Sequence, residues 1–121
     1  MSAEEQLGKY AEGWTKGDAK TILAATTESY VFDDPNAGQV AREDFDAYLQ
    51  GLKEAVAEAR GEQPDTPFMA LSDIVTQADD EILTAWCWWS IPGTGLQGSG
   101  LIKADARGVF YERIAYYTRL P

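Results

Sequence analysis

The sequence contains no histidine and only one cysteine, Cys87. Without histidine, serine–histidine and cysteine–histidine hydrolysis and the usual Cys/His zinc sites are excluded. A single cysteine also excludes a disulfide within the chain, and no sequence neighbour would activate the thiol, so we expect Cys87 to be a small core residue. An aspartate in an apolar setting is then the best candidate for proton transfer near pH 7.

Positive charge is scarce, because 10 Lys and Arg face 20 Asp and Glu, which gives a formal net charge of −10. Nucleic acids and anionic membranes both require a basic surface, so neither is an expected partner. No apolar run approaches the length of a membrane span, and the acidic start lacks the features of a signal peptide, so we expect a cytoplasmic protein. No calcium-loop pattern is present, and we predict neither a metal nor a cofactor.

The chain of 121 residues, 45% of them hydrophobic, is long enough to bury one core, so we predict a single domain over residues 1–121. Helical spacing follows a capping box at Ser2 and stops at Gly17, and Asp18 can cap a short helix over residues 19–25. A strand is predicted over residues 29–33, and a long amphipathic helix runs from about 41 to 60.

The second half changes to the two-residue periodicity of strands, which are predicted over residues 68–77, 82–91, 96–104 and 109–118. Helices followed by a meander of antiparallel strands indicate an α+β domain. The strand over 82–91 has no polar face, since Trp86 and Trp88 point to one side and Cys87 and Trp89 to the other. Helices can cover only one side of the sheet, so we predict a homodimer through the other; a strand sandwiched within one subunit is the alternative.

Asp34 is the strongest candidate for a catalytic base. It shares one strand face with Tyr30 and Phe32, and burial among aromatic rings raises the pKa of a carboxyl group towards neutrality. The simpler interpretation is that residues 33–38 form a polar turn. A register slip of one residue would instead bury Asp33.

Two groups of residues carry a resemblance to a known family. The first runs from Tyr10 through Trp14 to Gly17-Asp18, and the second from Tyr30 through Asp33-Asp34-Pro35 to Gly38. Together with the order of elements, they resemble the nuclear transport factor 2-like (NTF2-like) superfamily, which includes SnoaL-like polyketide cyclases and ketosteroid isomerases. The resemblance implies a cone-shaped, curved antiparallel sheet with N-terminal helices packed on its concave face, enclosing an apolar cavity.

The resemblance also implies roles for individual residues. Asp34 would remove a proton next to a carbonyl, and the hydroxyl of Tyr10, seven residues before Gly17, would donate a hydrogen bond to the developing enolate. Trp86, Trp88 and Ser90 fall where the family lines its cavity from the sheet. The predicted substrate-binding residues are Trp14, Tyr30, Phe32, Trp86, Trp88, Ser99 and Tyr116.

One difference from the ketosteroid isomerases weakens the assignment of these roles. Ketosteroid isomerases have a second acid as an oxyanion donor, whereas residues 97–101 contain none and Ser99 is a weak substitute. The leading hypothesis is a cofactor-free isomerase- or cyclase-like enzyme for a small apolar or aromatic ligand. The alternatives are a binding module with the same cavity but no turnover, and a module whose exposed sheet assembles with another protein.

Overall fold

The structure of the protein is a computed structural model that describes residues 1–62 and 66–117. The predicted helices are present as α1 (Ala3–Lys16), α2 (Ala19–Ala24) and α3 (Phe45–Arg60), the last preceded by the 3₁₀ turn η1 (Arg42–Asp44). The strands are β1 (Thr26–Asp34), β2 (Gly38–Ala41), β3 (Ala70–Asp79), β4 (Ile82–Ser90), β5 (Gln97–Asp105) and β6 (Gly108–Tyr116). Only β2 was not predicted, and the predicted strand end at residue 118 lies outside the described residues.

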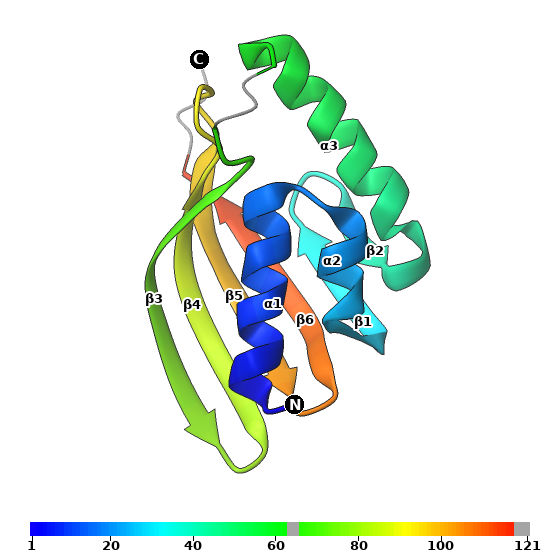
Figure 1. Ribbon diagram of the computed structural model, residues 1–121, viewed down its shortest axis with the longest axis vertical. Helices are drawn as coiled ribbons and strands as arrows, with labels where there is room; N and C mark the ends of the chain where they lie inside the picture. Colours follow the sequence, from blue (N-terminus) through cyan, green and yellow to red (C-terminus); the bar gives the residue numbers. More distant parts are fainter. Residues whose placement is uncertain (63–65, 118–121) are drawn as a thin grey trace.

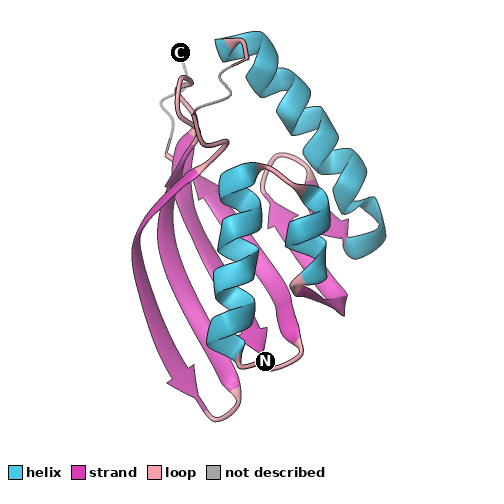
Figure 2. Cartoon of the chain, viewed as in Figure 1, coloured by secondary structure: helices cyan, strands magenta, loops and turns pink. Residues whose placement is uncertain are grey.

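The strands form one six-stranded sheet in the order β2-β1-β6-β5-β4-β3. Figures 1 and 2 show a curved, unclosed sheet with α1 and α2 in front of one face. This confirms the predicted α+β cone with N-terminal helices on the concave face. The prediction of an antiparallel sheet needs one correction: β1 and β6 pair in parallel, while the other neighbouring strands pair antiparallel.

The ends of the first two helices follow from local sequence. Ser2 and Glu5 form the predicted capping box, in which the Ser2 side chain accepts a hydrogen bond from the backbone N–H of Glu5. Gly17 ends α1 with a φ of 67°, a left-handed conformation that glycine adopts without steric cost. Asp18 then caps α2 by accepting from the backbone N–H of Lys20.

The core lies between the helices and the concave face of the sheet. Alternation along the strands points every second side chain into it, as in β4, where Leu83, Ala85, Cys87 and Trp89 are buried. Six aromatic side chains form a continuous cluster there: Tyr10, Trp14, Tyr30, Phe32, Phe45 and Tyr48. Among the described residues, no helix is both long and apolar enough to cross a membrane.

Close packing of α1 on α2 gives a test of the fold. A Cβ atom on Gly13 would lie 2.7 Å from the backbone nitrogen of Ile22, so Gly13→Ala should lower the free energy of unfolding by about 1–3 kcal/mol. Gly8 is the control, because it lies in the same helix and a Cβ atom added there would have no atom within 4 Å, and Gly8→Ala should stabilise by about 0.5–1 kcal/mol. Urea unfolding of both variants measures this, and equal effects would contradict the packing.

Candidate functional site: two buried carboxyl groups beside an aromatic pocket

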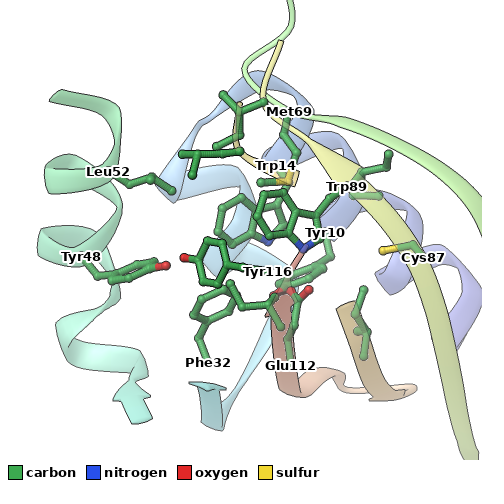
Figure 3. Close-up of a pocket in the computed structure, with 16 residues that line it drawn as sticks. Tyr10, Trp14, Phe32, Tyr48, Leu52, Met69, Cys87, Trp89, Glu112 and Tyr116 are labelled. Atoms are coloured by element: carbon green, nitrogen blue, oxygen red, sulfur yellow. Dashed lines mark hydrogen bonds between the residues drawn. The ribbon is translucent and has the colours of Figure 1, made fainter. Parts of the chain in front are cut away.

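A pocket lies between the helices and the sheet, and its walls are mainly aromatic and aliphatic (Figure 3). Its lining includes Tyr10, Trp14, Phe32, Tyr48, Trp89 and Tyr116; among the described residues that line it, Glu112 is the one acidic residue and none is lysine or arginine. The volume of the cavity is about 30 Å³, which leaves room for roughly two water molecules. A ring compound can therefore enter only if lining side chains move.

Glu112 is the carboxyl group that faces this pocket. It projects from β6, is only 5% exposed, and accepts a hydrogen bond from the hydroxyl of Tyr10. Burial raises the pKa of Glu112 to about 7, and the hydrogen bond from Tyr10 opposes that shift. Its other oxygen lies beside Gly100, where a Cβ atom would come within 2.6 Å. Gly100 therefore leaves the space that the carboxyl group occupies.

Tyr10 connects Glu112 to a second tyrosine. The hydroxyls of Tyr10 and Tyr30 are 2.6 Å apart, so while Tyr10 donates to Glu112, Tyr30 donates to Tyr10. Burial is the main reason that the pKa of both phenols is raised well above the ordinary value, and the nearby Glu112 carboxylate adds to it. Both hydroxyls therefore stay protonated and act as donors.

Asp34 is buried at the end of β1, with an exposed fraction of 2%. The hydroxyls of Tyr48 and Tyr116 donate to its Oδ2 at 2.6 and 2.9 Å, and the backbone N–H of Asn36 donates to Oδ1 at 2.8 Å. Figure 3 shows the hydroxyl ends of the two tyrosines close together, one from α3 and one from β6. Asp34 itself is not among the lining residues, but it is hydrogen-bonded to two of them, Tyr48 and Tyr116.

The two tyrosines that hold Asp34 have altered acidity. Burial, followed by the hydrogen bond to Asp34, raises the pKa of Tyr116 to about 12 and that of Tyr48 further. Asp33 points to the opposite face of the sheet, where it accepts a hydrogen bond from Tyr111 at 3.2 Å. Asp34, not Asp33, is therefore the buried acid, and the turn at residues 35–37 follows it.

The structure brings most of the predicted site residues together. Tyr10, Trp14, Phe32 and Tyr116 line the pocket, and Tyr30 lies one hydrogen bond behind Tyr10. Whether any of them acts on a ligand remains a prediction. The alternation of β1 and the helical spacing of α1, both readable from the sequence, put the residues of each element on one face, and the packing of α1 on the sheet brings these faces together.

The placement of Trp86, Trp88, Ser90 and Ser99 in the pocket was wrong. Trp86 and Trp88 are 43% and 41% exposed and lie on the convex face, opposite the helices. Ser99 pairs with Trp88 and shares that face, where its hydroxyl lies 2.9 Å from that of Tyr117. The alternation of β4 was correct, but alternation does not say which face the helices cover, and that face carries Cys87 and Trp89.

Sequence reasoning missed Glu112 and Tyr48. A signal for Glu112 was present, because it alternates with Ile114 and Tyr116 along a predicted strand and so had to share their buried face. Tyr48 was assigned only to the apolar face of the long helix. Among the described residues, no group of three or more Cys, Asp and Glu side chains is arranged to hold a metal ion.

Comparison with known proteins supports the fold. No family model and no curated protein matches the sequence. An NTF2-like protein from Cytophaga hutchinsonii superposes with a TM-score of 0.68 and 10% identity, covering 93% of each chain. A candidate polyketide cyclase from Xanthomonas campestris gives 0.63 and 18%, covering 93% of this chain and 87% of that chain.

A SnoaL-like protein of unknown function from Burkholderia thailandensis is similar to the same degree. Its TM-score is 0.63 at 14% identity, with 94% of this chain and 93% of that chain covered. At identities this low, the likeness shows the fold alone. The chain therefore has the NTF2-like fold, which confirms the resemblance predicted from its sequence.

The pKa of Glu112 predicts a pH dependence of stability. Between its ordinary value of 4.5 and about 7, the unfolded chain ionises this group while the folded chain keeps the proton. Wild type should therefore lose about 3 kcal/mol of unfolding free energy relative to Glu112→Gln as the pH rises through this range. Urea unfolding of both proteins at several pH values measures the difference. Parallel curves would show that the carboxyl group is not buried as described.

Proposed function

We propose that the chain is a cofactor-free enzyme that moves a proton at a carbon next to a carbonyl group, in the manner of an isomerase or cyclase. The observation that carries this proposal is Glu112, a buried carboxyl group with a pKa of about 7 facing an aromatic pocket. A proton-transfer group is most effective when its pKa is near the working pH. The likeness to a candidate polyketide cyclase is in keeping with this reaction.

In this mechanism, Glu112 exchanges the proton with the ligand, and Tyr10 keeps its predicted role. Ionised Glu112 takes the proton from carbon and becomes neutral. A neutral carboxyl group binds the Tyr10 hydroxyl less strongly than a carboxylate does, so the hydroxyl is released to the oxygen that now gains charge. Tyr30 continues to donate to Tyr10 and supports the negative charge from behind.

Asp34 remains the second candidate for the base. Both of its oxygens already accept hydrogen bonds, and Asp34 does not line the pocket, whereas the rings of its partners Tyr48 and Tyr116 do. It would reach a ligand only after those rings move, which entry of a ring compound also requires. In the absence of a ligand, its carboxylate orients the two tyrosines.

A deuterium-exchange experiment tests whether Glu112 or Asp34 is the base. Wild type in D₂O should exchange the hydrogens beside the carbonyl of a ring ketone such as 2-tetralone, with a rate that rises with pH and levels off above about 7. Glu112→Gln should lower the catalysed rate about 100-fold or more, because the amide cannot take up the proton. Asp34→Asn should lower it less than about tenfold, because the amide oxygen still accepts from a tyrosine. Proton NMR of the ketone measures the exchange.

Three other results have defined meanings. Loss of exchange in Asp34→Asn but not in Glu112→Gln would identify Asp34, and not Glu112, as the base. Binding of the ketone without exchange in wild type would favour a ligand-binding module. Absence of both would refute the proposed function for this class of ligand.

We also propose that the chain forms a homodimer through the convex face. Trp86, Trp88 and Tyr117 are exposed there, and the rings of Trp88 and Tyr117 pack 5.0 Å apart. Large apolar side chains gathered on one face commonly mark a protein interface. Assembly with a different protein is the alternative. A cytoplasmic location remains a prediction from the sequence.

Light scattering after gel filtration tests the dimer. Wild type should have the mass of two chains, and the double variant Trp86→Gln/Trp88→Gln should have the mass of one. Gly8→Ala is the control, because Gly8 is exposed on α1, on the opposite side of the sheet, and the mass of this variant should not differ from that of wild type. A monomeric wild type would refute the dimer, and circular dichroism confirms that each variant is folded.

A further inference from the structure

Trp14 has a buried hydrogen-bond donor without an acceptor. Its side chain is 4% exposed, and its indole Nε1 has no partner among the described residues. Gln6 Oε1 is the other buried side-chain atom of this kind in the described part of the chain, but Gln6 is not part of the pocket wall, whereas Trp14 is. Buried polar groups are nearly always satisfied, so an orphan donor at a pocket needs an explanation.

The aromatic side chains that pack against Trp14 do not supply an acceptor. Its ring packs against Tyr10, Phe32 and Phe45, with centroid distances of 6.4, 5.4 and 5.7 Å. The one oxygen among these three side chains, the Tyr10 hydroxyl, is already engaged by Glu112 and Tyr30. In contrast, the indole N–H of Trp89, in the same pocket wall, donates to the carbonyl oxygen of Ser99 at 3.0 Å. The indole N–H of Trp89 thus has an acceptor, whereas that of Trp14 has none among the described residues.

The charge of the pocket restricts what can satisfy Trp14. Within the described part of the chain, the lining contains Glu112 and no lysine or arginine, and Asp34 is hydrogen-bonded to the lining residues Tyr48 and Tyr116. A ligand carboxylate or phosphate would meet like charge and no cation, which is unfavourable in a region of low dielectric constant. The acceptor is therefore expected on a neutral molecule.

We propose that the indole N–H of Trp14 binds the oxygen of a neutral ring ketone or ether in this pocket and so determines which ligands are accepted. This inference rests on the proposed function for the location of the ligand, and it adds the residue that recognises the oxygen. The surrounding rings hold the apolar part of the molecule, and Trp14 sets its orientation. Removing the oxygen from the ligand, or the N–H from Trp14, should then have the same effect.

The test compares 1-tetralone with tetralin, the hydrocarbon of the same shape that lacks the carbonyl. The chain has four tryptophans, so ¹H–¹⁵N spectra of wild type should contain four indole signals, and Trp14→Phe assigns that of Trp14. The Trp14 signal should move downfield with 1-tetralone and much less with tetralin. The Trp89 signal is the internal control, because its N–H is already bound to Ser99 and should keep its hydrogen-bonded position.

Dissociation constants from the same titrations complete the test. After correction for the stronger hydration of the ketone, wild type should bind 1-tetralone about three- to tenfold more tightly than tetralin. Trp14→Phe should lose this preference. If both compounds bind but the Trp14 signal responds equally to each, the inference is wrong and the proposed ligand site stands. If neither compound binds to wild type, both the inference and the proposed function fail for this ligand class. The wild-type spectra give these answers even if the variant does not fold.

Discussion

Tyrosine hydroxyls make it possible to bury two carboxyl groups in the concave face of this sheet. An unpaired carboxylate in an apolar interior is strongly unfavourable, and hydrogen-bond donors offset that cost. Tyr10 donates to Glu112, while Tyr48 and Tyr116 donate to Asp34. Because Tyr10 belongs to α1 and Tyr48 to α3, these hydrogen bonds also join both helices to the sheet. The polar groups of the site are therefore part of what positions the helices around the pocket.

The two carboxyl groups differ in what surrounds them. Within the described residues, Asp34 accepts three hydrogen bonds and does not line the pocket, whereas Glu112 lines it and accepts one hydrogen bond, from Tyr10. Environment rather than residue type thus separates a carboxyl group held by protein hydrogen bonds from one that lines the pocket. The fold alone does not distinguish them, since this architecture hosts unrelated activities.

The two faces of the sheet carry different sets of residues because successive side chains of a strand point to opposite faces. On the concave face, the absence of side chains at Gly98 and Gly100 makes room for the Trp89 ring and the Glu112 carboxyl group. On the convex face, the same strands expose Trp86 and Trp88, and Ser99 lies partly buried beside Trp88. A single strand, β4, therefore contributes to the pocket with one set of residues and to the exposed surface with the other.

Local sequence determined the helices, all strands except β2, and the common face of Tyr30, Phe32 and Asp34, because periodicity and capping act over a few residues. Only the tertiary structure decided which face of β4 meets the helices, since both are apolar and alternation is symmetric. It also decided that Tyr10 and Glu112, 102 residues apart, meet. That contact depends on α1 packing across the sheet and on β6 lying between β1 and β5, and no local pattern encodes such long-range packing.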